Sequence, residues 1–251
     1  MMQIHFRSTE NHVRWAWTDG LQTLGQREIA AIVSWPERDP RDKILTHLFR
    51  FLENYLISQA KPILPEQTLR YGWTMLRFVS DGYHLSGAGP DALLIEEKQH
   101  PFSQDDSSYV PGVARTLALL QLQHEAMRRN RVTGDAMYPS ASQLAIICTR
   151  VTPEAVQHLR PLMAHRAWQP TTRASGWFIG CCNHEHDHNH PDELTSIHLL
   201  HLVERFPGLF PYIAMPVGIQ LLFEERQAIV FHPGEEHGQP DPESLLSFLL
   251  F

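Results

Sequence analysis

The chain has few cysteines: Cys148, Cys181 and Cys182 are the only three among 251 residues. An odd number with one adjacent pair is not the pattern of a disulfide-stabilised domain, and it is typical of a protein kept in a reducing compartment. A chain of this length buries about three quarters of its unfolded surface. Its apolar core therefore suffices to stabilise the fold without cross-links or metal.

Long apolar runs are also missing. The longest falls far short of the roughly 18 to 20 residues that span a bilayer. The first residues, MMQIHFRSTENHVRW, contain no basic stretch followed by an apolar one, so no secretion signal is evident. These absences predict a cytoplasmic protein with no membrane partner.

Positive charge is sparse. The chain has 21 Lys and Arg against 28 Asp and Glu, a net charge of −7, and its one basic cluster is Arg128, Arg129 and Arg131. Domains that bind nucleic acid neutralise phosphates with a basic face. We therefore expect no nucleic-acid partner, whereas a cationic protein would associate readily with an acidic one.

Hydrophobic periodicity predicts an α+β fold with mainly antiparallel sheets, flanking helices and two subdomains. Strands are expected at 2–7, 13–17, 27–35, 68–80, 92–96, 143–151, 176–182, 219–223 and 228–231. Helices are expected at 39–59, with Asp39 as N-cap, and at 111–130, 155–164, 192–206 and 243–251. The polar segment 169–175 predicts a junction between an N-terminal domain (1–168) and a C-terminal domain (174–251).

Signatures of catalysis are scarce. The sequence contains no G-x-S-x-G, no H-E-x-x-H, no P-loop and no complete dinucleotide-binding glycine pattern. Glu96, Glu97, Lys98 and His100 follow a predicted strand and offer acid–base groups, as in nucleases. No second acidic metal ligand accompanies them, so exposed charges at a strand end are the preferred interpretation.

The segment from Cys181 to His190 is rich in metal-binding side chains, with two thiols and four imidazoles in CCNHEHDHNH. Structural zinc sites use two close pairs separated by a longer span, whereas these residues form one stretch. Alternate histidines of an extended strand also lie along a line rather than at the corners of a tetrahedron. We therefore expect a solvated loop, with Asp187 and Asn189 holding its turn, and no metal or cofactor. A metal-binding protein or metal-dependent enzyme using 181–190 is the alternative.

Three groups of residues resemble a bacterial immunity-protein domain. They are Ser175-Gly176-Trp177-Phe178-Ile179-Gly180-Cys181, then His186-Asp187-His188-Asn189 with Leu194, and then Phe210-Pro211-Tyr212-Ile213-Ala214-Met215-Pro216-Val217-Gly218. The resembling family is the thirty-third in the series of immunity proteins for polymorphic toxins, together with its relatives. The resemblance covers about 174–232. His184, His190 and Cys182 depart from the family pattern.

This resemblance implies a cytosolic α+β protein that binds a cognate secreted toxin and occludes its active site, in a contact-dependent or type VI secretion setting. It implies no enzymatic activity and no catalytic residues. The expected partner is the toxin protein, and the candidate partner-binding residues are His184, Glu185, His186, Asp187, His188 and Asn189. An adaptor module of a secretion apparatus is a third possibility.

Overall fold

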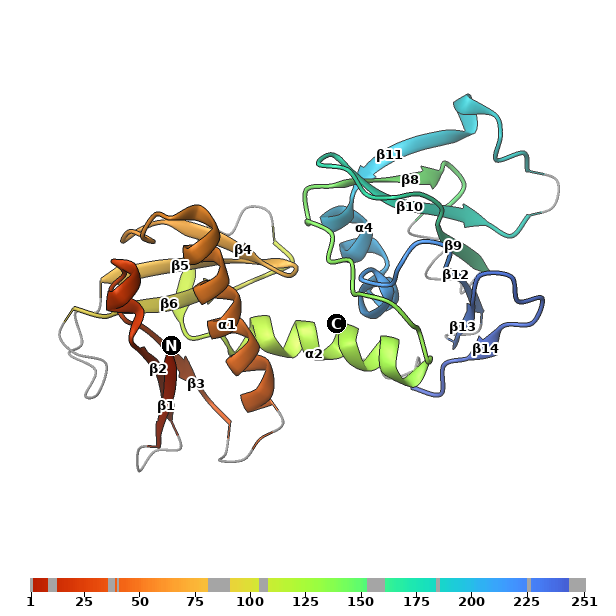
Figure 1. Ribbon diagram of the computed structural model, residues 1–251. Helices are drawn as coiled ribbons and strands as arrows, with labels where there is room; N and C mark the ends of the chain where they lie inside the picture. Colours follow the sequence, from red (N-terminus) through yellow and green to blue (C-terminus); the bar gives the residue numbers. More distant parts are fainter. Residues whose placement is uncertain are drawn as a thin grey trace. The chain divides into compact units, whose positions relative to one another are not determined.

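The computed structural model describes residues 2–8, 13–35, 39, 41–80, 91–103, 108–152, 161–183, 186–224 and 227–243. It contains two mixed, mostly antiparallel sheets with helices (Figure 1), which confirms the predicted α+β class. The chain divides into two compact units, Met1–Gln121 and Leu122–Phe251. None of the described helices is long and apolar enough to cross a membrane.

The first unit is built on a seven-stranded sheet. Six strands follow the order β1-β2-β3-β6-β5-β4, and β7 also pairs with β6. The β3–β6 pair is parallel and the other neighbouring pairs are antiparallel. The strands are β1 (Gln3–Ser8), β2 (Arg14–Asp19), β3 (Ile29–Val33), β4 (Thr68–Tyr71), β5 (Thr74–Ser80), β6 (Leu93–Lys98) and β7 (Tyr109–Pro111); the 3-10 turn η1 (Leu21–Leu24) follows β2.

Helix α1 (Arg41–Gln59) supplies the helical part of this core. Its buried residues recur at helical spacing: Leu45, Leu48, Phe49, Leu52 and Leu56. Asp39 Oδ1 accepts a hydrogen bond from the Arg41 backbone N–H at 2.9 Å, the capping role expected from the sequence. The boundary between the units falls within helix α2 (Ala114–Arg129).

One strand predicted in the first unit is wrong as a single element. The segment 68–80 forms two antiparallel strands, β4 and β5, with a turn at Gly72. Gly72 has a φ of +59°, and a Cβ there would lie 2.5 Å from Leu120 Cδ2. The positive φ of the turn therefore requires Gly72, and the aromatic-rich pattern around it concealed the turn.

The second unit contains another seven-stranded sheet, in the order β11-β8-β10-β9-β12-β13-β14. The β8–β10 pair is parallel and the other neighbouring pairs are antiparallel. The elements are β8 (Leu144–Cys148), β9 (Leu162–Arg166), β10 (Ala174–Cys181), η2 (Pro191–Glu193), β11 (Leu194–His198), α4 (Leu199–Arg205), η3 (Pro207–Tyr212), β12 (Gln220–Glu224), β13 (Gln227–Phe231) and β14 (Gln239–Pro240).

Two helices predicted in this unit are wrong in part. Residues 162–164 belong to strand β9, which lies between β10 and β12, and 153–160 lie outside the described residues. Of the predicted helix 192–206 only α4 is α-helical, because 194–198 pairs with β8 as strand β11 and 192–193 belong to the 3-10 helix η2. Pairing with neighbouring strands makes both segments extended, and the hydrophobic periodicity of each segment did not reveal this pairing. The predicted C-terminal helix lies outside the described residues from 244 onward.

The predicted domain boundary and the boundary of the compact units differ. The expected junction, 169–175, covers the connection from β9 to β10 and the first two residues of β10, and these two strands pair with each other in one sheet. The compact units divide at Gln121 and Leu122 instead.

The core of the second unit is organised around a buried guanidinium. Arg166 has an exposed fraction of 0%, and its Nη1 donates hydrogen bonds to the carbonyl oxygens of Met137, Ile213 and Met215 at 2.9, 2.9 and 2.6 Å. Trp177 Nε1 donates to the same Ile213 carbonyl at 3.0 Å. Burial lowers the pKa of Arg166 to about 10. These bonds satisfy backbone carbonyls of two segments, at 137 and at 213–215, which lie outside the strands of the sheet.

A second buried charge, Asp241, anchors the end of the described chain. Its carboxylate accepts hydrogen bonds from Arg129 Nε and Nη2 at 2.6 and 2.8 Å, from the Tyr212 hydroxyl at 2.6 Å and from Asn130 Nδ2 at 3.1 Å. Burial alone would raise the pKa of Asp241. The hydrogen bonds from Arg129, Tyr212 and Asn130 outweigh it and hold that pKa below its ordinary value of 3.8.

Replacing this carboxylate should destabilise the second unit. Asp241→Asn removes the buried counter-ion of Arg129 and leaves only the half-exposed Glu243 beside it, and the loss of a buried partner costs about 3 to 5 kcal/mol of unfolding free energy. Because the pKa of Asp241 is lowered by folding, the wild type keeps this stabilisation above pH 3.8 and loses it as the pH falls further. Urea unfolding of both proteins at neutral pH and at about pH 3 measures the effect.

The matched control is Glu243→Gln, which removes a half-exposed carboxylate 3.5 Å from the same arginine. Glu243→Gln should lower the free energy of unfolding by no more than about 1 kcal/mol. Equal stability of Asp241→Asn and the wild type at neutral pH would contradict the role given to Asp241.

Candidate functional site

The acid–base candidates at the end of β6 have structural partners. Glu96 Oε2 accepts two hydrogen bonds from Arg77, at 2.8 and 2.6 Å. Glu97 is buried and accepts the backbone N–H groups of Arg115 and Thr116 at 3.0 and 2.7 Å, which caps the first turn of α2. The expectation of exposed charges is therefore wrong for Glu97. Lys98 is the last residue of β6 and His100 follows it. The carboxylates of Glu96 and Glu97 are engaged in the contacts above and are not free to act with Lys98 or His100 in acid–base chemistry.

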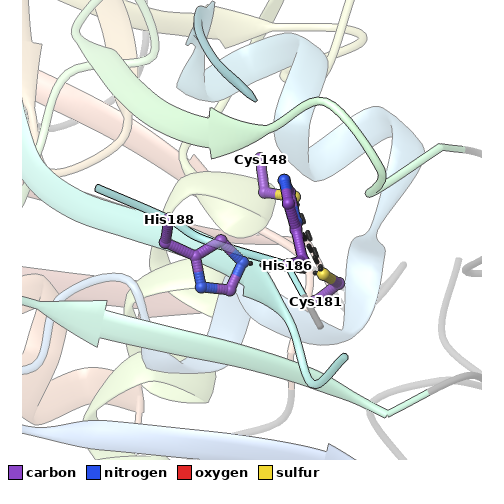
Figure 2. Close-up of side chains that lie close together, drawn as sticks. All are labelled: Cys148, Cys181, His186 and His188. Carbon is purple, nitrogen blue, oxygen red and sulfur yellow. Dashed lines mark hydrogen bonds between the residues drawn. The ribbon is translucent and has the colours of Figure 1, made fainter. Parts of the chain in front are cut away.

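Four metal-binding side chains of the second unit converge at one end of its sheet. Figure 2 shows Cys148, Cys181, His186 and His188 side by side. Each offers one ligand atom, and these atoms all lie within 4.8 Å of one another. Only three of the four come from the sequence segment 181–190. The convergence depends on Cys148, which lies 33 residues before Cys181.

The parallel pairing of β8 and β10 brings the two cysteines together. Parallel strands end at the same edge of a sheet, and Cys148 and Cys181 are the last residues of these two strands. Their sulfur atoms are 3.8 Å apart, and all three cysteines are free thiols.

Gly180 lets His188 approach the sheet. A Cβ at Gly180 would lie 3.2 Å from His188 Cε1 and 2.9 Å from Phe178 Cε1. The His188 ring packs edge-on against Phe178, with ring centroids 5.4 Å apart, and its Nε2 is 3.6 Å from Cys181 Sγ. The absence of a side chain at this position therefore helps to place the imidazole.

His186 lies between the two thiols and a carboxylate. Its side chain is buried, and Nδ1 is 3.2 Å from both Cys148 Sγ and Cys181 Sγ. On the other side of the ring, Nε2 is 3.0 Å from Glu193 Oε2, which also accepts a hydrogen bond from Thr149 Oγ1 at 3.2 Å. The imidazole is thus oriented from both of its nitrogen atoms.

Backbone N–H groups approach both sulfur atoms. The Arg150 N–H donates to Cys148 Sγ at 3.4 Å, and the Asn183 N–H donates to Cys181 Sγ. Burial raises the pKa of the Cys148 thiol. Burial also acts to raise the pKa of Cys181, but the hydrogen bonds from His186 and Asn183 outweigh it and lower that pKa. Cys181 is therefore more readily ionised than Cys148.

The pKa values of the two imidazoles, His186 and His188, shift in opposite directions. The hydrogen bond to Cys181 raises the pKa of His186 against the effect of desolvation, and Glu193 adds to it. Burial lowers the pKa of His188, and the neighbouring His186 lowers it further. Cys182, adjacent to the cluster, has its pKa raised by burial and by the nearby Cys181 and Glu224.

The outward-facing part of the segment is held by a local turn. Asp187 Oδ1 accepts hydrogen bonds from the Asn189 backbone N–H at 2.9 Å and from its Nδ2 at 3.0 Å, which confirms the structural role predicted for this pair. Both residues are exposed, as is His190. His184 and Glu185 lie outside the described residues. Of the candidate partner-binding residues, His186 points inward, His188 is half-buried, and only Asp187 and Asn189 are described as exposed.

Cys148 is the member of this cluster that sequence reasoning missed. It lies within a predicted strand, 143–151, as Cys181 lies within the predicted strand 176–182, and a cysteine in the last residues of each strand is the signal that was present in the sequence. The parallel pairing of those strands was not predicted, because mainly antiparallel sheets were expected. The argument that all candidate metal ligands lie in the single stretch 181–190 is therefore wrong, because Cys148 belongs to a different strand, β8.

Comparison with known proteins agrees with the second compact unit. Residues 122–232 match the Imm33-like domain family, and the match begins at the first residue of that unit. Residues 122–232 form an Imm33-like domain. This is a family of immunity proteins, typically non-enzymatic, and it implies toxin neutralisation with a cognate toxin as partner. No curated protein and no solved structure gives a significant match to the chain.

Aromatic residues of two of the three groups that carried the family resemblance lie in the core of the Imm33-like domain. Trp177 is fully buried, and so are Phe210 and Tyr212. Gly176, at a φ of +82°, lies so close to the Trp168 carbonyl oxygen that a Cβ would be 2.1 Å from it. The motif Ser-Gly-Trp-Phe thus maintains the packing of β10 against its neighbours and supplies no reactive group.

Substituting Gly176 should show that this motif stabilises the fold. Gly176→Ala forces an alanine into the left-handed backbone conformation and places its Cβ against a backbone oxygen that cannot move aside. We therefore expect the free energy of unfolding to fall by about 3 kcal/mol or more. Gly234 has the same φ of +82° with no atom within 4 Å of an added Cβ. Gly234→Ala should therefore lower the free energy of unfolding only by the strain of an alanine in the left-handed conformation, about 1 to 2 kcal/mol. Equal unfolding midpoints for the two variants would contradict the packing role.

Proposed function

We propose that this protein binds a cognate toxin and neutralises it by covering the toxin's active site. The match of residues 122–232 to an immunity-protein family carries the proposal. The net charge of −7 supports it, since an acidic surface complements a basic or substrate-binding cleft. The toxin would be the product of a neighbouring gene, delivered by kin cells through a contact-dependent or type VI secretion route, and neutralised in the cytoplasm.

The exposed turn after His186 is the proposed edge of the contact surface. Asp187, Asn189 and His190 face solvent there, and Asp192 follows, also exposed. The two carboxylates place negative charge on a turn whose backbone is fixed by the hydrogen bonds from Asn189 to Asp187. A fixed loop loses little conformational entropy on binding, which favours affinity. His184 and Glu185 belong to the same proposed surface.

The occlusion mechanism is tested with the purified toxin. The immunity protein should form a complex that elutes as one species in gel filtration, and its inhibition of the toxin should be competitive with substrate. Co-expression should restore growth to cells that carry the toxin gene. A stable complex in which the toxin keeps its turnover would contradict occlusion, and no complex with no rescue would contradict the function itself.

The turn is tested by neutralising its charge without changing its shape. Asp187→Asn combined with Asp192→Asn keeps an oxygen acceptor at position 187, so the turn can persist. We expect about a tenfold weaker complex, chiefly through slower association at low salt. Glu236→Gln, an exposed carboxylate after β13, is the control and should leave the affinity unchanged. Calorimetry and stopped-flow association measure both; an unchanged association rate in the double variant would exclude this turn from the interface.

A further inference from the structure

Within the cysteine–histidine cluster, the sulfur–sulfur distance and one sulfur–nitrogen distance equal the edges of a coordination tetrahedron, and two sulfur–nitrogen distances are about 0.4 Å shorter. All four ligand atoms lie within 4.8 Å of one another. With Zn–S near 2.3 Å and Zn–N near 2.05 Å, a tetrahedral site places two sulfurs about 3.8 Å apart and a sulfur and a nitrogen about 3.6 Å apart. In this chain the two sulfurs are 3.8 Å apart. The sulfur–nitrogen distances are 3.2 Å to His186 from each cysteine and 3.6 Å from Cys181 to His188.

We propose that Cys148, Cys181, His186 and His188 bind one zinc ion. Two thiolates and two imidazoles are the donor set that favours zinc in tetrahedral geometry. The ion's two positive charges balance the two thiolates, so the bound site is neutral, which suits a buried Cys148. This inference reverses the expectation of no metal drawn from the sequence. It does not depend on the toxin.

A disulfide between Cys148 and Cys181 is a weaker explanation of the same geometry. A disulfide requires its sulfurs about 2.05 Å apart, and these lie 3.8 Å apart. It would also leave unexplained why His186 Nδ1 faces both sulfurs and His188 Nε2 faces Cys181 Sγ. A metal ion accounts for all four side chains at once.

Groups around the cluster have the arrangement that supports metal ligands. A histidine that binds metal through Nδ1 carries its proton on Nε2, and Glu193 accepts that proton's hydrogen bond at 3.0 Å. Such carboxylate–histidine pairs orient the ring and increase its basicity as a ligand. The N–H groups of Arg150 and Asn183 donate to the sulfurs and stabilise them as thiolates.

The site has the character of a structural zinc centre. The chain supplies four donors, which completes a tetrahedron and leaves no position for a water or a substrate. The ion would join the ends of β8 and β10 to the segment 186–188, and thereby fix the base of the exposed turn at Asp187 and Asn189. The buried core around Arg166 and Trp177 lies outside this set of ligands, so metal removal should loosen the turn and leave that core folded.

Zinc content of the full chain, purified without an affinity tag, is the first test. Elemental analysis after growth with added zinc should give about one zinc per chain, and cobalt in its place should give tetrahedral bands with thiolate charge transfer. Cys148→Ser and His188→Ala should each lower zinc affinity by at least about 100-fold. Cys182→Ser and His190→Ala are matched controls, because each removes the same side-chain type beside the cluster, and both should keep full zinc content.

The wild-type measurements keep the test valid if Cys148→Ser fails to fold. A chain that takes up no zinc or cobalt under reducing conditions would overturn the proposal, as would zinc bound without thiolate charge transfer. Retention of zinc by a folded Cys148→Ser, with loss only in His184→Ala or His190→Ala, would also overturn it, because the ion would then lie in the loop alone. A reducible Cys148–Cys181 cross-link in freshly isolated protein, detected by mass spectrometry, would favour the disulfide.

The supporting carboxylate gives a graded effect. Glu193→Ala removes the partner of His186 Nε2 and leaves all four ligands in place, so zinc affinity should fall by about 10- to 100-fold, as for other carboxylates behind metal-bound histidines. Glu204 forms a similar pair with the half-exposed His201 Nδ1 at 2.9 Å, away from the cluster. Glu204→Ala is therefore the control and should not change affinity in a competitive chelator titration. Equal affinity of Glu193→Ala and the wild type would contradict the proposed ligation through His186 Nδ1.

Discussion

The parallel pairing of β8 with β10 is the constraint on which the second unit depends. The other neighbouring strand pairs of that sheet are antiparallel, and antiparallel neighbours place the end of one strand beside the start of the next. The one parallel pair places two strand ends side by side, and each of these strands ends in a cysteine. The position of the thiols is thus a property of topology, and the segment after β10 only has to fold back over them.

The same strand, β10, serves two purposes along its length. Its first half contributes Gly176 and Trp177 to the buried arrangement around Arg166, where a guanidinium and an indole satisfy backbone carbonyls of the segment after α4. Its last residues, Gly180 and Cys181, reach the edge where the histidines gather. The family resemblance in the sequence spans both halves, so one set of motifs describes a packing requirement and a cluster of ligands that have different physical causes.

The sequence predicted those elements whose signal is local. The buried stripe of α1 and its Asp39 cap, the β12–β13 hairpin and strand β10 all follow from periodicity and capping residues. Strand β9 was not predicted, because LMAHR is short and follows a proline, and only its position between two other strands makes it extended. The cysteine–histidine cluster was not predicted for the same reason, because no local pattern connects Cys148 with a loop more than 30 residues later. Long-range pairing is the information that a single sequence conceals.

A metal centre and an inhibitor's contact surface place compatible demands on this turn. An inhibitor that covers an active site benefits when its contact loop is already in the bound shape, because ordering each residue on association costs about 1 kcal/mol or more. On its outer side the described turn is held by the Asp187–Asn189 hydrogen bonds and by the His190 backbone N–H, which donates to the Asp187 carbonyl oxygen at 3.3 Å. Coordination of His186 and His188 at the inner side would fix it from below, leaving Asp187 and Asn189 free to face a partner. The two proposals then concern opposite faces of one segment: its imidazoles hold the loop to the sheet, and its carboxylates meet the toxin.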